Sequence, residues 1–460
     1  MKIYNTMSRS KEEFVPIKPG KVKLYACGPT VYNYFHIGNA RAFLFFDVVR
    51  RYFEFRGMEV TYVQNITDID DKIIAQAIEE GIPFSEVAAK YTFAFLEDAK
   101  RLGLKAPHFQ PRATGVMPEI IALIHALQKS GHAYEADGDV YFATASISQY
   151  GSLSGKKVEE QLAGARVAEN TKKRNAADFT LWKRAKAGEP EWDSPWGKGR
   201  PGWHSECVVM SRQYLGETFD IHGGGVDLVF PHHENEQAQA YALTGKPLAN
   251  YWMHNGFLNI EGEKMSKSLN NFFTAREILA EYDAEVIRFF FLSKHYRSPI
   301  DFNRELIAES ARALKNFHAA FKSVDFLQVQ DSPSIGGYES AEREFNEAMD
   351  DDFNTAKAIA VLFELAHQAK SAELPMPERI AAAHMLYHLG GALGFFQSLE
   401  EPAQDINHLT EDLINLIISY RVSARTEKNW ALSDKIRDDL KALGVILSDT
   451  KEGCTWTVET

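Results

Sequence analysis

The chain has 460 residues, of which 45% are hydrophobic and 25% are charged, and its formal net charge is −12. This composition excludes a disordered chain and indicates a soluble protein that is large enough for several domains, each with its own core. The net negative charge argues against a protein that coats nucleic acid by bulk charge alone, although it allows a local basic surface.

The cysteines and the absence of apolar runs bear on location. Cys27, Cys207 and Cys454 are too few and too scattered for a disulfide framework. The N-terminal residues show no charged-then-apolar leader, and no apolar run approaches the length of a bilayer-spanning helix. We therefore expect a cytoplasmic protein whose cysteines are free for metal binding or chemistry.

The first part of the chain predicts a βαβ unit. Residues 22–27 form a β-like run that Gly28-Pro29 ends, residues 39–55 carry apolar side chains at helical spacing, and residues 59–63 form a second β-like run. This order favours a parallel sheet with a right-handed crossover. Ligands of such sheets bind at the carboxyl ends of the strands.

Polar clusters follow the predicted strands at these ends. Cys27 ends the first run, and residues 65–68 follow the second. A third run, residues 218–221, ends in His222-Gly223-Gly224-Gly225, and the stretch FPHHENE, residues 230–236, comes soon after. Independent surface residues have no reason to collect at strand ends, so we expect one functional rim.

An insertion and a helical tail complete the pattern. From residue 111 to about 202 come a predicted helix (117–129), a hairpin-like stretch (133–142) and a loop rich in tryptophan, proline and glycine. After Phe302 the pattern is helical almost to the end. Linkers are predicted at residues 331–337 and 400–404.

Two motifs suit phosphate groups. His36, Gly38 and Asn39 lie between the first predicted strand and helix, where backbone donors and the helix dipole favour phosphate and glycine permits close approach. Lys264 and Lys267 flank Ser266 in a polar loop and can hold a polyphosphate. Each motif alone is a weak signal, because a solvated loop can have the same sequence. The two motifs together on a βαβ framework are a specific signal.

The stretch FPHHENE has two interpretations. A helix that begins at Pro231 places His232 and Glu236 one turn apart on the same face, which is a pair that a metal can use. Alternatively, Glu234 complements the helix dipole and the histidines are polar surface or satisfied core groups. Taken alone, the stretch favours this second interpretation.

The two phosphate motifs, His36-Ile37-Gly38-Asn39 and Lys264-Met265-Ser266-Lys267-Ser268, resemble the signature pair of class I aminoacyl-tRNA synthetases. Further stretches resemble the cysteinyl-tRNA synthetase family along nearly the whole chain, namely residues 25–32, 65–72, 202–207, 220–225, 230–236 and 349–355. One departure is visible, because the usual final histidine of the first signature is Asn39. An asparagine amide can still donate to a phosphate oxygen or a nucleotide edge.

The resemblance implies an α/β fold. It consists of a Rossmann-type parallel-sheet catalytic domain with an insertion, followed by an α-helical bundle and a small C-terminal domain. The expected bounds are 1–110 and 201–302 for the two catalytic halves, 111–200 for the connective insertion, 303–400 for the tRNA-binding bundle and 401–460 for the anticodon-binding domain.

The resemblance also implies a reaction: cysteine is activated with ATP to cysteinyl-adenylate and then transferred to the 3′-terminal adenosine of tRNA(Cys). His36 and Asn39, with Lys264 and Lys267, are the expected catalytic residues, and Mg²⁺ accompanies the ATP. Expected nucleotide contacts are Thr30, His36, Gly38, Asn39, Gly223, Gly224, Asp227 and Lys267. Asp227 can equally be an ordinary loop aspartate. The family suggests a monomer.

The family's zinc site maps onto Cys27, Cys207, His232 and Glu236, and the resemblance implies that this Zn²⁺ takes the substrate thiolate as an added ligand. A purely structural zinc is the alternative, since four-ligand sites are more often structural. His233 and Glu234 are left as neighbours. Trp203, beside Cys207, either walls the substrate pocket or is part of the core. Thr67 and Asp68 either touch substrate or cap a helix.

The tail is the expected tRNA-binding part. Trp430 can stack on an unpaired anticodon base, with Asp434 or Arg437 reading the base edge, or it can be a helix-packing side chain. Two other functions stay open. A related ligase that joins cysteine to an amino sugar is expected to lack residues 303–460, and a noncatalytic zinc-stabilised RNA-binding protein would not need both phosphate motifs.

Overall fold

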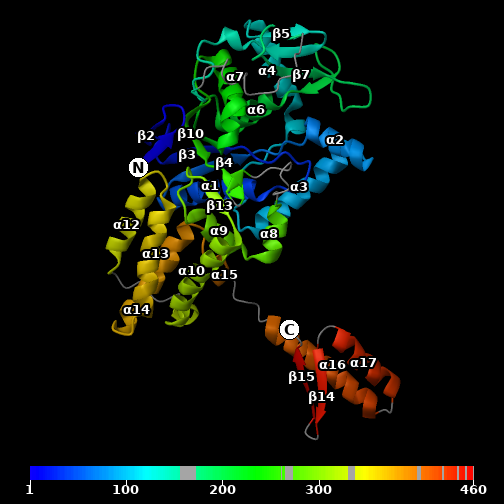
Figure 1. Ribbon diagram of the computed structural model, residues 1–460, viewed down its shortest axis with the longest axis vertical. Helices are drawn as coiled ribbons and strands as arrows, with labels where there is room; N and C mark the ends of the chain where they lie inside the picture. The colour runs from blue at the N-terminus through cyan, green and yellow to red at the C-terminus, as the bar shows by residue number, and fades with distance from the viewer. Residues whose placement is uncertain are drawn as a thin grey trace. The chain divides into compact units, whose positions relative to one another are not determined.

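The computed structural model describes residues 1–155, 172–260, 262–264, 273–329, 337–400, 406–426, 429–442, 445–450 and 453–458. It divides into two compact units, Met1–Phe396 and Gln397–Thr460 (Figure 1). Across these ranges, no helix combines the length and the apolar composition that a membrane span requires.

A parallel sheet forms the centre of the larger unit. Its strands are β3 (Lys21–Ala26), β4 (Glu59–Gln64), β9 (Phe219–Gly225) and β10 (Ala249–Asn255). They pair in the order β10-β9-β3-β4, and all three pairings are parallel. Helix α1 (Ile37–Phe55) connects β3 to β4, which confirms the predicted βαβ unit.

The third predicted strand is longer than expected. Residues 218–221 were the predicted run, but β9 continues to Gly225, because its last residues still pair with a neighbouring strand. His222 pairs with Trp252 of β10 and with Tyr25 of β3, so this histidine lies inside the sheet. A Cβ atom on Gly223 would lie 2.1 Å from the Phe46 ring of α1, so close packing of helix on strand requires this glycine.

The insertion forms its own antiparallel sheet at the top of Figure 1. Its strands are β5 (Ala133–Ala136), β6 (Asp139–Phe142), β7 (Phe179–Arg184) and β8 (Gly199–Pro201), paired in that order. Helix α4 spans Met117–Lys129, which confirms the predicted helix, and β5 with β6 confirms the predicted hairpin. Helices α6 (Trp203–Leu215) and α7 (Glu234–Thr244) pack on each other and on α4.

The chain forms further elements before residue 303. They are β1 (Lys2–Asn5), β2 (Ser10–Glu13), α2 (Asp71–Glu80), α3 (Phe84–Arg101), β11 (Leu258–Ile260), β12 (Glu263–Lys264), α8 (Ala275–Glu281), α9 (Ala284–Leu292), β13 (Ile300–Phe302) and the single turns η1 (Ala113–Val116), η2 (Thr144–Ser146) and η3 (Val226–Leu228). Helix α8 begins with a capping box, in which Thr274 accepts from the Glu277 backbone and Glu277 accepts from the Thr274 backbone.

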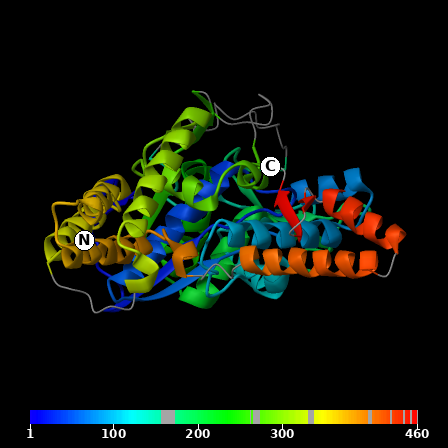
Figure 2. The same cartoon turned by 90° about the horizontal axis from the view of Figure 1, so that it is seen from below.

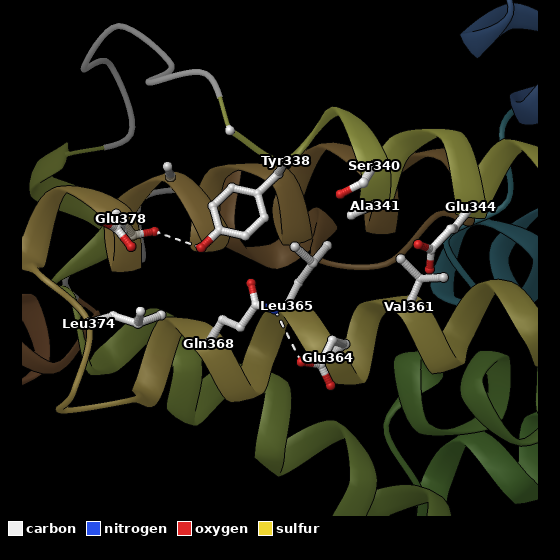
Figure 3. A pocket seen from close by; sticks show the side chains of 12 residues that line it. Tyr338, Ser340, Ala341, Glu344, Val361, Glu364, Leu365, Gln368, Leu374 and Glu378 are labelled. Atoms are coloured by element: carbon white, nitrogen blue, oxygen red, sulfur yellow. Dashed lines mark hydrogen bonds between the residues drawn. The ribbon is translucent and has the colours of Figure 1, made fainter.

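The helical pattern after Phe302 is confirmed. Helices α10 (Arg304–Lys322), α11 (Phe326–Val329), α12 (Glu339–Asp350), α13 (Thr355–Lys370) and α14 (Met376–Ala392) follow one another. The longer ones form a bundle, which is also seen from below in Figure 2. A pocket of about 780 Å³ lies between α12, α13 and α14, where Tyr338 donates to the backbone carbonyl of Glu378 (Figure 3).

The smaller unit holds α15 (Gln397–Glu400), α16 (Ile406–Thr426), α17 (Trp430–Ala442) and a hairpin of β14 (Val445–Thr450) and β15 (Gly453–Val458). Its small core contains Ile414, Ile418, Leu440 and Val445. Of the two predicted linkers, residues 331–336 and 401–404 lie outside the described residues. The five predicted domain bounds stay predictions.

Candidate functional site

The carboxyl ends of the parallel strands bring the predicted ligands together. Cys27 directly follows β3, whereas Cys207 lies in the first half of α6, and their sulfur atoms are 3.9 Å apart. His232 Nε2 lies 3.6 Å from the Cys207 sulfur and 2.9 Å from Glu236 Oε1. The potential ligand atoms of Cys27, Cys207, His232 and Glu236 all lie within 4.8 Å of one another, and all four residues are buried.

The start of helix α7 differs from the prediction. The α-helix begins at Glu234 rather than at Pro231, and an irregular turn, Val229–His233, precedes it. Phe230 has an extended backbone there (φ −136°, ψ 133°), so the regular helical hydrogen bonds start only after it. His232 and Glu236 nevertheless lie one turn apart and in contact, as the spacing predicted.

Four further histidines, His204, His222, His233 and His254, lie around the cluster, and of these the sequence placed only His233, as a neighbour of the ligands. His204 Nδ1 lies 3.0 Å from His232 Nδ1. His222 Nε2 lies 2.7 Å from Glu236 Oε2, and His233 Nε2 lies 3.2 Å from the Cys27 sulfur. His254, in β10, bonds to the other ring nitrogen of His233 at 2.8 Å. The ligand atoms of Cys27, His222, His233 and Glu236 form a second set within 4.8 Å. The one available signal was the position of His222 at a strand end.

The other polar residues of FPHHENE hold the insertion. Glu234 accepts from the backbone N–H groups of Gly151 (2.9 Å) and Ser154 (2.8 Å). Asn235 accepts from the Tyr150 hydroxyl at 2.5 Å. Burial raises the pKa of Glu234 above its ordinary value. The first turn of α7 therefore contacts the cluster through Glu236 and the loop of residues 150–154 through Glu234 and Asn235.

The two thiols of the cluster differ in their pKa. A hydrogen bond from Cys27 lowers the pKa of Cys207 to about 6, and His232 contributes in the same direction. Burial, followed by the bond to Cys207, raises the pKa of Cys27 well above its ordinary value. Burial disfavours the charged forms of His232 and Glu236, but the Glu236 carboxylate raises the pKa of His232 to about 10. His222, followed by His232, lowers the pKa of Glu236 well below its ordinary value. Cys207 is thus the thiol that ionises first.

Trp203 lies against the cluster. Its ring stacks on the His232 ring, with centroids 4.0 Å apart and an interplanar angle of 13°. The side chain is half-buried, so it does not belong to the fully buried core, and its place in a substrate pocket stays a prediction.

Thr67 and Asp68 do not cap a helix, which corrects that alternative. Asp70 is the N-cap of α2, where its carboxylate accepts from the Lys72 backbone. Asp68 accepts from the backbone and hydroxyl of Thr114 instead. Thr67 donates its hydroxyl to Glu206 Oε2 at 2.9 Å, and both residues are buried.

The first phosphate motif lies at the start of α1. His36 is the N-cap, and its Nδ1 accepts from the Asn39 backbone N–H at 3.2 Å. Gly38 is in the first helical turn, and Thr30 forms an isolated parallel bridge with Thr67. The positive end of the dipole of this 19-residue helix therefore lies at the sheet edge, where the Ile37 N–H donates to the Phe273 carbonyl at 3.0 Å and the Asn39 N–H is bonded to His36.

The other expected nucleotide contacts are less closely grouped. Gly224 lies beside His233, since an added Cβ would be 2.9 Å from the His233 ring. Asp227 is exposed, in the turn η3 after β9. Lys264 ends β12, and Lys267 lies outside the described residues.

The three expected tRNA contacts lie on helix α17 of the smaller unit. Trp430 is 58% exposed, which does not fit the alternative of a helix-packing side chain. Arg437 and Asp434 form an exposed ion pair at 3.1 Å one turn further on. Cys454, for which the sequence suggested no role, accepts from Arg421 at 3.5 Å.

Comparison with known proteins defines the class. A family model described as "tRNA synthetases class I (C) catalytic domain" matches residues 13–312, and one described as "DALR domain" matches residues 344–397. The fold is similar to that of the LeuRS in the LeuRS-tRNA-LeuAMS ternary complex from Agrobacterium radiobacter K84 (TM-score 0.59, 12% identity, 83% of this chain and 84% of that one). It is also similar to Mycobacterium tuberculosis methionyl-tRNA synthetase in complex with methionyl-adenylate (TM-score 0.57, 14% identity, 81% and 89%). Fold and catalytic-domain match together define a class I aminoacyl-tRNA synthetase.

Sequence relatives are more specific. The cysteine–tRNA ligase of Carboxydothermus hydrogenoformans is 52% identical over 99% of both chains. That of Geobacter sulfurreducens is 48% identical over 100% of both chains. The chain therefore belongs to the cysteine–tRNA ligase family. Both matches include the tail that the amino-sugar alternative is expected to lack.

Proposed function

We propose that this ligase activates cysteine with ATP to cysteinyl-adenylate, transfers it to the 3′-terminal adenosine of tRNA(Cys), and selects cysteine through a Zn²⁺ held by the buried cluster. Family membership supports the reaction. The single observation that carries the metal assignment is the convergence of four ligand atoms within 4.8 Å from Cys27, Cys207, His232 and Glu236.

The cluster fits zinc by its chemistry. Two thiols, an imidazole and a carboxylate are a donor set that suits this borderline-soft ion. Burying several groups that ionise to anions is costly unless a cation compensates them, and among the described residues no lysine or arginine forms an ion pair with these four side chains. When bound there, Zn²⁺ would supply an additional coordination position for the substrate thiolate, which a hydroxyl cannot match at neutral pH because its proton is far harder to remove.

The chain's own residues orient the substrates. Trp203, stacked on His232, would wall the pocket for the cysteine side chain, and Thr67 bonds to Glu206 on the same helix α6. His36 and Asn39 would present donors to the ATP phosphates at the positive end of α1. Lys264 and Lys267 would hold the departing pyrophosphate together with Mg²⁺.

Glycines and a carboxylate would complete the nucleotide site. Gly38, Gly223 and Gly224 would allow the nucleotide to approach the backbone, and Thr30 lies at the same edge as Gly38. Asp227 would contact the ribose or the substrate amine. Little covalent work falls to the protein, so positioning and charge stabilisation provide the catalysis.

The tail would read the tRNA. The bundle of residues 303–400 would contact the tRNA, and the unit that contains Trp430, Asp434 and Arg437 would contact its anticodon. The exposure of Trp430 supports base stacking. We further propose a cytoplasmic monomer, on the basis of the family.

X-ray absorption at the zinc edge, combined with cysteine-dependent pyrophosphate exchange, tests the proposal. We expect about one zinc per chain, exchange without tRNA, charging of tRNA(Cys), and one more sulfur neighbour after cysteine is added. An unchanged number of sulfur neighbours would contradict selection through the metal even if the protein charges tRNA. Exchange without any tRNA charging would contradict the tRNA assignment.

A further inference from the structure

The four expected metal ligands lie on three chain segments, which must be held at fixed positions relative to one another. Cys27 follows β3, Cys207 is on α6, and His232 and Glu236 lie on either side of the start of α7. Cys27 and Cys207 are 180 positions apart in the chain, yet their sulfur atoms lie 3.9 Å apart. Contacts between residues that are distant in the sequence must therefore set the distance between the two sulfur atoms.

The loop after β3 packs tightly on the loop after β4. A Cβ atom on Gly28 would lie 1.7 Å from the backbone oxygen of Asn65, so only glycine fits next to Cys27. The Gly28 N–H donates to the Asn65 side-chain oxygen at 2.8 Å. Asn65 is thus attached to the backbone immediately after the first thiol ligand.

A chain of buried hydrogen bonds then leads to the second thiol ligand. Asn65 Nδ2 donates to the Thr67 hydroxyl at 3.2 Å, and that hydroxyl donates to Glu206 Oε2 at 2.9 Å. Glu206 directly precedes Cys207 on α6. Asn65 is 1% exposed, Thr67 2% and Glu206 1%, so no solvent competes for these bonds.

We propose that Asn65, Thr67 and Glu206 are positioning residues that fix the separation of Cys27 and Cys207 before a metal binds. The inference rests on the proposed metal site. A buried hydroxyl and a buried carboxyl are costly without partners, so each holds the other in place and thereby holds the two segments that carry the thiols. Groups that orient metal ligands are commonly worth a factor of about 10 to 100 in metal affinity.

This assignment changes the expected role of Thr67. A threonine hydroxyl has one proton, and the Thr67 proton is directed to Glu206 while its oxygen accepts from Asn65. Thr67 therefore acts on the substrate through the metal ligands. A direct substrate contact and a positioning role give different results when metal binding is measured without substrate.

Thr67→Val tests the proposal, because valine keeps the shape of threonine and removes the hydroxyl. Thr67→Ser keeps the hydroxyl and serves as the conservative rescue. Thr92→Val is a matched control, since Thr92 is also a buried threonine (2% exposed) and its hydroxyl has no hydrogen-bond partner among the described residues. If Thr67→Val does not fold, Thr67→Ala takes its place.

The readout is the affinity of the metal-stripped full-length protein for Zn²⁺, measured by chelator competition without cysteine or ATP. We expect Thr67→Val to weaken binding by about 10-fold or more, and to shift the thiolate-to-metal absorption bands of the Co²⁺-loaded protein. Thr67→Ser and Thr92→Val should stay within about twofold of the unmodified protein.

Three results would overturn the inference. Unchanged Zn²⁺ affinity and Co²⁺ spectrum in Thr67→Val, with a raised KM for cysteine, would make Thr67 a substrate contact instead. An equal loss in Thr67→Ser would show that the hydroxyl is not the cause. If the unmodified protein binds no Zn²⁺, the proposed metal site itself fails, which distinguishes that failure from failure of the positioning role alone.

Discussion

Two of the buried clusters of charged side chains in the larger unit differ in how their charges balance. In the first, Asp47 of α1 accepts from Arg51 at 2.8 Å, from Arg288 at 2.8 Å and from the Lys105 backbone at 2.9 Å. Arg288 also donates to the carbonyl of Gly103. Although burial disfavours the Asp47 carboxylate, the charges of Arg288 and Arg51 lower its pKa.

The second cluster is the expected metal site, and its charges do not balance internally. Cys207 and Glu236 have lowered pKa values and are anions, whereas burial raises the pKa of the Cys27 thiol, and His232, with its pKa raised to about 10, supplies one positive charge against the two negative charges. Burial lowers the pKa of His233. A buried cluster with balanced charge completes itself and supports the fold. A buried cluster that has more negative than positive groups requires a cation from solution. This difference in charge balance distinguishes a structural ion network from a candidate metal site.

The largest expected effect is on chemistry. Cys207→Ser should reduce bound zinc and lower cysteine activation by about 10⁴-fold, or about 5 kcal/mol of transition-state stabilisation. It should also narrow the preference for cysteine over serine, whereas ATP binding should suffer less. Zinc content and pyrophosphate exchange with both amino acids measure this.

Cys454→Ser is the control for that variant, because Cys454 is a thiol of the smaller unit and should leave zinc and exchange unchanged. Full selectivity in a zinc-depleted Cys207→Ser enzyme would indicate a purely structural metal. The two buried clusters would then have the same kind of role.

The balanced cluster should respond in stability instead. Asp47→Asn leaves Arg288, which is 1% exposed, without its charged partner, and we expect a loss of about 3 to 5 kcal/mol in the free energy of unfolding. Urea unfolding measures the loss, and zinc content of the folded protein should not change.

Glu54→Gln provides the comparison for Asp47→Asn, since Glu54 lies on the same helix and is 28% exposed in its pairs with Arg50 and Lys105. Because solvent partly screens these pairs, Glu54→Gln should lower the free energy of unfolding by only about 1 kcal/mol. Equal losses in the two variants would contradict the importance that we give to burial.

A smaller effect follows from pH. Because the folded-state pKa of Asp47 is lowered, its contribution is present above the unfolded-state pKa, near about 4, and is lost as the pH falls through the folded-state value. The stability difference between the unmodified protein and Asp47→Asn should therefore be constant near neutral pH and shrink in acid. Unfolding curves at several pH values measure it, and a difference that grows in acid would contradict the sign.

A modest effect is expected for a residue that lies in neither cluster. Trp430→Ala should weaken tRNA(Cys) binding by about tenfold, within the range of about 1 to 3 kcal/mol for base stacking, and leave adenylate formation intact. Filter binding measures the affinity. Leu432→Ala, a 45% exposed position on the same helix, is the matched control, and equal weakening in both variants would remove the specific role of the indole ring.

Much of the fold and part of the site followed from the sequence alone. The βαβ unit, the helix 117–129 and the hairpin 133–142 were predictable because periodicity and turn residues act over short distances. The pairing of His232 with Glu236 was predictable because four residues make about one helical turn. The complete ligand set came from family resemblance, since no local rule connects Cys27 to Cys207.

Only the tertiary structure decided what surrounds those ligands. The contacts of His222 and His233 with the cluster, the hold of Glu234 on the insertion and the hydrogen bonds from Asn65 through Thr67 to Glu206 all join residues that are distant in the sequence. Such contacts depend on the register of the parallel strands and on the packing of α6 against α7. Residue spacing within one segment determines neither of them. The same holds for the start of α7 at Glu234, because Phe230 takes an extended backbone and delays the helix despite a favourable local sequence.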